Sequence, residues 1–431
     1  MSPSGSGRQA VEAAWRIESA RIVGALTRYT GDFALAEDLA QEALAEALVA
    51  WPRDGVPRSP AGWLLTVGRR RAVDAYRRRA ALDVRYAALA RDLDEGGASS
   101  GGADPRQTGP APDADLLWDP DRIDDDVLSL MFISCHPILS REAQVALTLR
   151  VLGGLTSDEI GRGCLVPTAT VQARITRAKK TLAAGRVPFT LPPPAERRER
   201  LGSVLSVLYL VFTEGSSATS GPEWMRPDLA REAVRLARIV ARLMPDEPEA
   251  HGLLALLELT AARFPARVGH DGEPVLLEQQ DRRRWDRAAI RRGRAALAQA
   301  GRVGRGLGAY GLQAAIAECH AVASSVDETD WDRIVLLYEA LGRLAPSPVV
   351  ELNRAVAVSM AQGPAAALPL VDDLVAAGSL AGSHLLPSVR GELLARLGRS
   401  AEARDELDLA ARLCGNERER DLLRGKVAAL G

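Results

Sequence analysis

The stretch "LTSDEIGRGCLVPTATVQARITRAKKTL" (Leu155–Leu182) decides the fold prediction for its part of the chain, because it has the pattern of two short helices joined by a turn. Thr156 followed three residues later by Glu159 is a capping box, which marks the start of a helix. Gly161 and Gly163 permit the tight turn that comes next. The stretch therefore predicts a helix–turn–helix unit.

The second helix of this unit has two contrasting faces, and Thr168 can cap its start. One face is an apolar stripe at helical spacing that is expected to pack on the first helix: Val171, Ile175, Ala178 and Leu182. On the opposite face, small side chains let the backbone approach a groove, Gln and Arg can contact base edges, and Lys suits a phosphate. This face comprises Ala169, Thr170, Gln172, Ala173, Thr176, Arg177 and Lys180.

The helix–turn–helix unit is either a DNA-reading element or a surface helix hairpin of a repeat domain, and its local charge distinguishes these two interpretations. The whole chain of 431 residues carries a net charge of −1, so a nucleic-acid site has to arise locally. From Ser140 to Arg186, eight basic residues oppose three acidic ones, which gives +5. Together with the capping box and the turn glycines, this charge favours a DNA-reading element.

The composition of the chain bounds its class. Its length suggests about three domains, and apolar residues recur with periods near 3.6 without β-type alternation, so we predict an all-α protein. The N-terminus lacks a signal peptide and no window resembles a membrane span. The four cysteines lie far apart without a CxxC motif, and Cys135-His136 is interpreted as a helix-end pair. We therefore expect a cytoplasmic protein with no membrane partner, metal site or cofactor.

Residues 8–82 are predicted to form a first helical domain. Its second helix, "FALAEDLAQEALAEALVAW", presents a mixed acidic and leucine face that suits a partner helix, and an exposed helix face is the alternative. The loop "PRDGVPRSP" follows, flanked by Trp51 and Trp63. The third helix ends in the arginine cluster Arg77–Arg79. Aromatic rings beside cations can stack unpaired bases, whereas a charge run is more often a solvated face.

The remaining segments are assigned by composition and repetition. Residues 83–126 are predicted to be a flexible acidic linker, since eleven acidic residues oppose two arginines between Asp92 and Asp126. Residues 127–186 hold the helix–turn–helix unit, and 187–197 form a proline-rich connector. Residues 198–431 contain helix-pair repeats: residues 347–378 align with residues 385–416 at an offset near 36, and residues 228–259 resemble a third unit. A period in this range predicts a tetratricopeptide-like (TPR-like) solenoid.

No motif predicts catalysis. The string "GLGAYG" (Gly306–Gly311) fits GxGxxG, but a dinucleotide loop requires a preceding strand, so we interpret it as a helix-to-helix connection. The five histidines are scattered. The chain is therefore not expected to be an enzyme.

The block "GDFALAEDLAQEALAEALVAW…SPAGWLLTVGRRRAVDAYRRR", followed by a linker and "SREAQVALTLRVLGGLTSDEIGRGCLVPTATVQARITRAKKTL", resembles an extracytoplasmic-function (ECF) sigma factor of the sigma-70 family. Order and spacing match over about residues 8–186. The remainder resembles the helical-repeat extension of one subgroup. The resemblance implies region 2 in residues 8–82 and region 4 in 127–186, with core RNA polymerase (β′ clamp and β flap) and promoter DNA as partners.

The resemblance also implies roles for individual residues. Core polymerase binding falls on the second helix, at Asp38, Gln41, Glu42, Leu44 and Leu48. Contact with the −10 element falls on Trp51, Trp63, Arg70, Arg71, Asp74, Arg77, Arg78 and Arg79. The polar face of the second helix in the helix–turn–helix unit, from Ala169 to Lys180, corresponds to the −35 reader, and this helix is called the recognition helix. One departure from the family pattern is Gly68-Arg69-Arg70, where the family often has an Asn beside an Arg.

The sequence thus predicts an alternative sigma factor that recognises −35 and −10 elements and directs transcription initiation, with the repeats regulating its activity. Two alternatives remain: a stand-alone helix–turn–helix regulator with a repeat sensor domain, and a repeat scaffold whose basic helices are incidental. A protein or peptide is the candidate ligand of the repeats. The sequence does not define the promoter, the inducing signal, the need for an anti-sigma factor or the oligomeric state.

Overall fold

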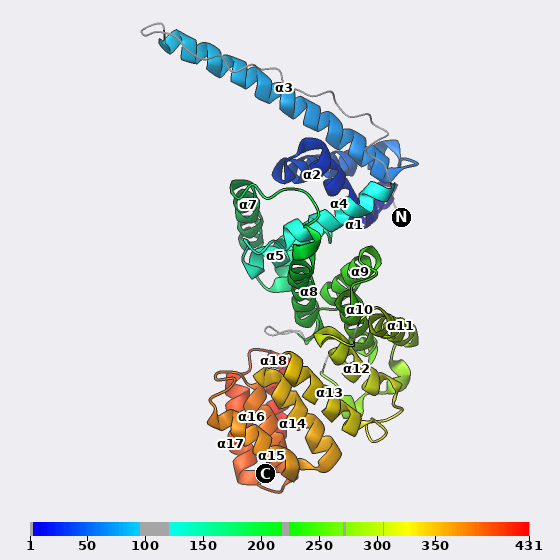
Figure 1. Ribbon diagram of the computed structural model, residues 1–431, viewed down its shortest axis with the longest axis vertical. Helices are drawn as coiled ribbons and strands as arrows, with labels where there is room; N and C mark the ends of the chain where they lie inside the picture. Colours follow the sequence, from blue (N-terminus) through cyan, green and yellow to red (C-terminus); the bar gives the residue numbers. More distant parts are fainter. Residues whose placement is uncertain (1–2, 95–119, 218–223, 270–272, 305, 431) are drawn as a thin grey trace. The chain divides into compact units, whose positions relative to one another are not determined.

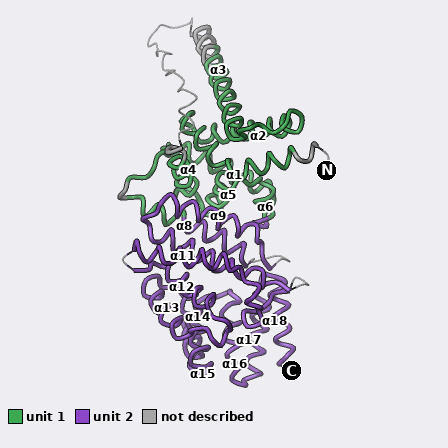
Figure 2. The backbone as a smooth tube through the Cα atoms, turned by 90° about the vertical axis from the view of Figure 1, so that its right-hand side faces the viewer, with its two compact units in different colours: residues 1–162, 166–204 green, residues 163–165, 205–431 purple. Residues whose placement is uncertain are grey.

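The computed structural model of the chain describes residues 3–94, 120–217, 224–269, 273–304 and 306–430. These residues are helical apart from loops and one isolated β-bridge between Val268 and Pro274, so the predicted all-α class is confirmed (Figure 1). None of the described helices has both the length and the apolar character that a bilayer span requires. The chain divides into two compact units: residues 1–162 with 166–204 form unit 1, and residues 163–165 with 205–431 form unit 2 (Figure 2).

Unit 1 is built around its first helix, which packs on the second, third, fourth and fifth helices. Ile22 and Leu26 on this helix are fully buried. A Cβ atom at Gly68 would lie 2.8 Å from a methyl carbon of Leu26, so the glycine lets the third helix approach closely. The helices are α1 (Pro3–Thr30), α2 (Phe33–Asp54), α3 (Pro60–Asp94), α4 (Pro120–Ser134), α5 (Arg141–Val151), α6 (Ser157–Cys164), α7 (Thr168–Ala184) and the first part of α8 (Pro194–Ser216).

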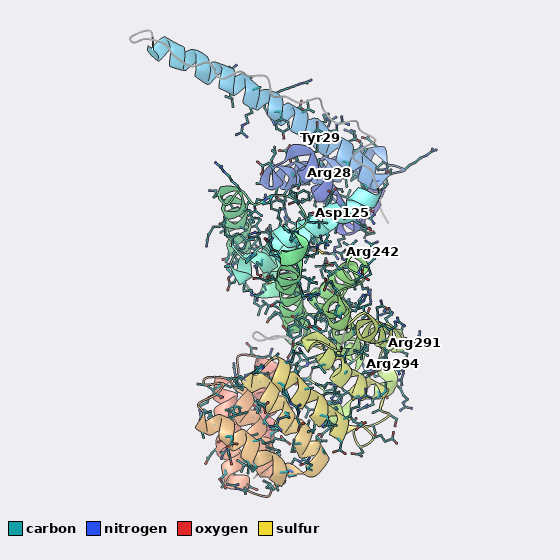
Figure 3. All side chains as sticks on the ribbon, in the orientation of Figure 1. Arg28, Tyr29, Asp125, Arg242, Arg291 and Arg294 are labelled. Carbon is teal, nitrogen blue, oxygen red and sulfur yellow. The ribbon has the colours of Figure 1, made fainter. Side chains whose placement is uncertain are left out.

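Local capping explains where two of these helices begin. The Asp32 side chain accepts hydrogen bonds from the Ala34 and Leu35 amides at 2.9 and 3.1 Å, which satisfies two free donors at the start of α2. Ser140 caps α5 in the same way. Charge also joins α1 to α4, because Arg28 forms an ion pair with Asp126; Figure 3 labels Arg28 beside its neighbour Tyr29.

Several predicted boundaries differ from the structure. The loop predicted from Pro52 is shorter, because α2 continues to Asp54, where Gly55 with φ +90° ends it. A proline near the end of a helix removes only one backbone hydrogen bond. The predicted linker 83–126 is also shorter, since α3 reaches Asp94 and α4 begins at Pro120; the remaining residues 95–119 lie outside the described residues. The predicted connector 187–197 is shorter too, because α8 begins at Pro194.

Unit 2 consists of successive antiparallel helix pairs (Figure 1). The two segments aligned in the sequence at an offset near 36 coincide with two of these pairs, α14–α15 and α16–α17. The third repeat proposed from the sequence, Asp228–Leu259, covers the pair α9–α10, although α10 packs more extensively on α11 than on α9. The helices are α9 (Pro227–Leu243), α10 (Pro248–Ala261), α11 (Arg287–Val303), α12 (Ala309–Val322), α13 (Trp331–Leu344), α14 (Pro348–Gln362), α15 (Pro364–Ala376), α16 (Leu385–Arg396), α17 (Ser400–Leu413) and α18 (Glu417–Ala429).

An irregular segment between α10 and α11 interrupts the pairing. It contains the short 3₁₀ turns η2 (Phe264–Ala266), η3 (Leu277–Gln279) and η4 (Arg282–Arg284). Arg282 is buried and donates to the carbonyl oxygens of His320 and Ala323 at 2.6 and 2.7 Å. A buried cation needs such partners, so this arginine anchors the segment to the end of α12. The "GLGAYG" string joins α11 to α12, as predicted.

Glycine sets the distance between α10 and α12. A Cβ atom at Gly252 would lie 2.7 Å from the backbone nitrogen of Gly311, so the two helices touch through their backbones. Gly301 on α11 offers a contrast, because a Cβ atom there would have no neighbour within 4 Å.

We predict that Gly252→Ala destabilises unit 2 by about 1–3 kcal/mol, the usual cost of overpacking a tight contact. The matched control Gly301→Ala should be neutral or stabilising by up to about 1 kcal/mol, because alanine favours a helix. Denaturant unfolding followed by circular dichroism measures both. Equal stability of the two variants would show that the close contact between α10 and α12 contributes nothing.

Candidate nucleic-acid interface

The helix–turn–helix unit begins with the predicted capping box. The Thr156 amide donates to the Glu159 carboxylate at 2.8 Å, and the Glu159 amide donates to the Thr156 hydroxyl at 3.1 Å. A Cβ atom at Gly161 would lie 2.8 Å from the carbonyl oxygen of Val166, so the turn requires a glycine there. The left-handed position of the turn is Leu165, with φ +50°.

The prediction that Thr168 caps α7 is wrong. The N-cap of α7 is Pro167, which has no side-chain hydrogen-bond acceptor, and the Thr168 hydroxyl donates to Asp158 at 3.2 Å instead. Thr168 therefore links the start of α7 to α6. The sequence pattern could not distinguish these roles, because they differ by one residue in where the helix begins.

The two faces of α7 are arranged as the sequence indicates. The apolar stripe is buried, with Val171, Ile175, Ala178 and Leu182 each at most 7% exposed. Its main partner is α5, whereas the sequence pointed to the preceding helix α6. Six residues of the opposite face are exposed and Thr170 is half-buried; the exposed ones are Ala169, Gln172, Ala173, Thr176, Arg177 and Lys180. The face that the sequence assigns to DNA is therefore accessible along the whole helix.

The exposed side of α2 carries the residues assigned to polymerase. Asp38 and Glu42 are exposed. Gln41, Leu44 and Leu48 are half-buried. These five residues lie at helical spacing on one side of α2, so they can contact a partner together.

Glu37 departs from the mixed face that the sequence suggested for α2, because its side chain is only 4% exposed. It forms an ion pair with Arg150 of α5 at 3.3 Å and a second with Lys179 of α7. Lys179 also bonds Asp38 at 2.7 Å. This cluster, called here the Glu37 cluster (Glu37, Asp38, Arg150 and Lys179), joins α2 to α5 and α7.

Electrostatics favour the charged form of Lys179 in the Glu37 cluster. Burial alone lowers the pKa of Lys179, but Glu37 and Asp38 outweigh it, and the pKa lies above its ordinary value. Breaking a buried pair leaves an uncompensated charge, which typically costs about 3–5 kcal/mol. The cluster therefore holds α2 and α7 together. Sequence reasoning missed it, since Glu37 and Asp38 lie more than a hundred residues from Arg150 and Lys179 along the chain.

The two tryptophans that flank the loop have different environments. Trp51 is 2% exposed and fills the core, which differs from the expectation that its ring contacts DNA. Its ring centroid lies 5.7 Å from that of Trp63, with the planes at 75°. Trp63 is half-buried, so it remains accessible at the surface. The buried Trp51 ring therefore packs against Trp63 from the core side.

The arginines of α3 fall into two groups. Arg70 and Arg71 donate hydrogen bonds to Glu46 of α2 at 2.6 and 2.9 Å. These bonds hold the pKa of the Glu46 carboxyl below its ordinary value, and the bond from Arg71 has the larger effect. Burial acts in the opposite direction but is outweighed. Further along α3, Asp74, Arg77, Arg78 and Arg79 are exposed. Among these exposed groups, the cations available to a phosphate backbone are Arg77, Arg78 and Arg79, and Arg70 is itself 60% exposed beside its contact with Glu46.

Gly68 and Arg69 occupy the position where the sequence departs from its expected pattern. Gly68 is buried against Leu26 of α1, and Arg69 lies over the ring of Tyr29 at 5.7 Å from its centroid. A larger residue at position 68 would force α1 and α3 apart. The departure therefore serves packing within unit 1.

Comparison with known proteins gives these two halves of unit 1 separate counterparts. The family described as Sigma-70 region 2 matches residues 16–81, and the family described as Sigma-70, region 4 matches residues 129–182. A family of unknown function (DUF6596) matches residues 200–301. No solved structure matches the chain.

One relative matches nearly the whole chain. An uncharacterized protein of Rhizobium meliloti (strain 1021) is 45% identical over 412 residues, which is 94% of this chain and 92% of the relative. The two proteins therefore correspond over nearly their whole lengths. The chain belongs to the sigma-70 family, whose two matching regions support a role in transcription initiation through core RNA polymerase and promoter DNA.

Proposed function

We propose that the chain is an alternative sigma factor of the ECF type that directs core polymerase to promoters with −35 and −10 elements. The observation that carries the proposal is the accessible polar face of α7 above a fully buried stripe. A helix with this division can enter a major groove with its small, amide and basic side chains against the bases. A role beside polymerase also implies the cytoplasm.

The −10 contact is assigned to the surface around Trp63 and the exposed part of α3. Asp74 and the arginines at 77–79 are exposed, and Trp63 rests on buried Trp51. An aromatic ring beside cations suits an unpaired base and its phosphates. In this proposal Arg70 and Arg71 contact the −10 DNA while they remain bonded to Glu46. Trp51 does not contact DNA and only positions Trp63.

Binding of α2 to the β′ clamp requires a change in the Glu37 cluster. Asp38 belongs to the proposed polymerase surface, yet Lys179 of the recognition helix bonds it. We propose that the compact arrangement of unit 1 is the free state, and that core binding opens the contact between α2 and α7. The recognition helix then becomes free to reach the −35 element.

The repeats of unit 2 are proposed to form a TPR-like solenoid that regulates the sigma regions by binding a protein or peptide. Successive helix pairs with an offset near 36 residues support this assignment. Stacked pairs create extended concave surfaces, which such proteins use for binding. The stand-alone regulator remains the alternative, and the polymerase surface of α2 distinguishes the two functions.

We predict that Gln41→Ala with Leu44→Arg weakens binding to core polymerase by about 1–3 kcal/mol, because truncated interface residues typically cost this much. Surface plasmon resonance with immobilised core polymerase measures the affinity. The control Ile17→Arg changes a residue of α1 that is 67% exposed and outside the proposed surface, so it should bind normally. Equal affinities for both variants, with intact circular dichroism, would favour the stand-alone regulator.

We predict that Arg177→Ala reduces promoter binding by the holoenzyme on a promoter selected from a random library. A base contact should relax specificity at one position by about 1–3 kcal/mol, whereas a phosphate contact should lower the salt slope by about one unit. Arg162 of α6 is an exposed arginine outside the DNA face and provides the control. Unchanged affinity, specificity and salt slope would remove Arg177 from the DNA surface.

We predict that Lys179→Met opens unit 1 and strengthens core binding several-fold, because it leaves buried Glu37 with Arg150 alone and frees Asp38. Lys180→Met is the matched control, since Lys180 is exposed on the same helix. Spin labels at Ala45 and Ala173, in a chain carrying Cys164→Ser, report the distance between α2 and α7. The closed-state proposal fails when Lys179→Met leaves both the distance distribution and the core affinity as in the parent.

A further inference from the structure

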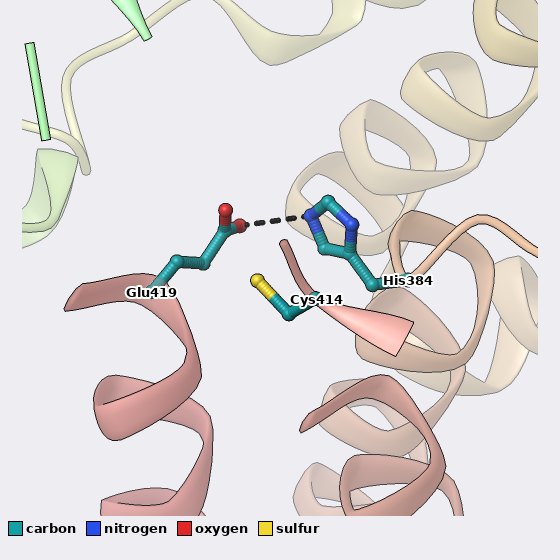
Figure 4. A group of neighbouring side chains, drawn as sticks. All are labelled: His384, Cys414 and Glu419. Atoms are coloured by element: carbon teal, nitrogen blue, oxygen red, sulfur yellow. Dashed lines mark hydrogen bonds and ion pairs between the residues drawn. The ribbon is translucent and has the colours of Figure 1, made fainter. Parts of the chain in front are cut away.

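Three side chains of unit 2 that are distant in the sequence converge at the end of the repeats. His384 is the N-cap of α16, Cys414 is the C-cap of α17, and Glu419 lies in the first turn of α18. The His384 Nε2 atom lies 3.2 Å from Glu419 Oε1. The Cys414 Sγ atom completes a group in which all three candidate ligand atoms lie within 4.8 Å of one another (Figure 4).

From this convergence we propose that His384, Cys414 and Glu419 bind a zinc-like divalent transition-metal ion. Thiolate sulfur, imidazole nitrogen and carboxylate oxygen are the three donor types that proteins use for zinc. Three protein ligands leave one position of a tetrahedral ion for water or another small ligand. Among the described residues, no other three-ligand group has this convergence.

The geometry needs little rearrangement. Nitrogen and oxygen ligands of a tetrahedral zinc ion stand about 3.3 Å apart when each bond is about 2.0–2.1 Å. The His384–Glu419 separation already matches this edge, and the cysteine sulfur lies within 4.8 Å of both ligand atoms. The Cys414 thiol donates to the carbonyl oxygen of Asn416 at 3.5 Å and also interacts with Glu419, and it ceases to be a donor when its proton is released on metal binding.

The surroundings of the three ligands support a bound cation. Cys414 is 3% exposed, while His384 and Glu419 are about one-quarter exposed, so the group has an apolar side and an opening to solvent. The Asn416 side chain accepts from the Glu419 amide at 3.2 Å, which fixes the first turn of α18. Arg420 donates twice to the Cys414 carbonyl oxygen, which fixes the end of α17. Partners of this kind orient metal ligands.

The protonation state of Cys414 responds to the ion. Without a metal, burial is the main reason why the pKa of the Cys414 thiol is raised, and the nearby Glu419 carboxylate raises it further. A divalent cation reverses this preference, because the thiolate is the ligand and the proton is released to solvent. Metal binding should therefore tighten as the pH rises.

The proposed site lies where the repeats need support. The last apolar cluster is small, and Leu423 is the one buried residue that α18 contributes to it. An ion held by the start of α16, the end of α17 and the start of α18 would fasten the terminal helix to the preceding pair. Binding to the folded state alone then raises the stability of the repeats.

The test uses the full-length chain, stripped with a chelator and kept reduced, and titrated with Co²⁺ as the probe. We expect one equivalent to produce a thiolate-to-cobalt charge-transfer band with intense visible bands typical of tetrahedral cobalt, and Zn²⁺ to displace it. Cys414→Ser should abolish the charge-transfer band. Glu419→Gln, which keeps a hydrogen-bonding partner for His384, should weaken binding by about tenfold or more.

Controls separate this site from other thiols and from misfolding. Cys164→Ser removes the cysteine that is least buried and should leave the titration unchanged. Zn²⁺ should raise the melting temperature of the parent chain more than that of Glu419→Gln, whose circular dichroism should match the parent. The proposal is overturned if the parent gives no charge-transfer band, or if Cys414→Ser retains it.

Discussion

The burial of Glu37 is the constraint on which the arrangement of unit 1 depends. A carboxylate that is 4% exposed requires compensating charge, and Arg150 and Lys179 supply it from two other helices. Because Lys179 also bonds Asp38, the same contact that neutralises Glu37 occupies part of the surface assigned to polymerase. One ion-pair cluster therefore connects α2, to which polymerase binding is assigned, with α7, to which DNA reading is assigned.

Local patterns in the sequence predicted the parts of the fold that depend on neighbouring residues. The Thr156–Glu159 capping box and the buried stripe of α7 are both present, because each is set by spacing along one helix. The face of α7 that the same reasoning assigned to DNA lies at the surface, with Thr170 half-buried. This reasoning failed for Thr168, where a one-residue shift in the helix start changed the hydrogen-bond partner.

Features that depend on long-range contacts could not be predicted in this way. Trp51 is the last residue of the helix predicted from the sequence, just before a loop, and this position fits either a core or a surface residue. Its burial in the structure, with Trp63 packed against it, decides for the core. The pairing of Glu37 with Lys179 and the meeting of His384 with Cys414 have no local signature, since no known spacing motif connects their positions. Repeat units were visible as an offset near 36 residues, but their phase depended on which helices pack together.

The central claim is that the chain gives core polymerase a promoter specificity that neither partner has alone. Transcription in vitro on fragmented genomic DNA, with 5′ ends mapped by sequencing, tests it most directly. We expect new start sites that appear only when the chain and core polymerase are combined. Two shared sequence blocks should lie upstream of these sites at a fixed spacing. The sites should disappear with the double variant Gln41→Ala, Leu44→Arg. An unchanged set of start sites, together with sequence-specific DNA binding by the chain alone, would contradict this claim.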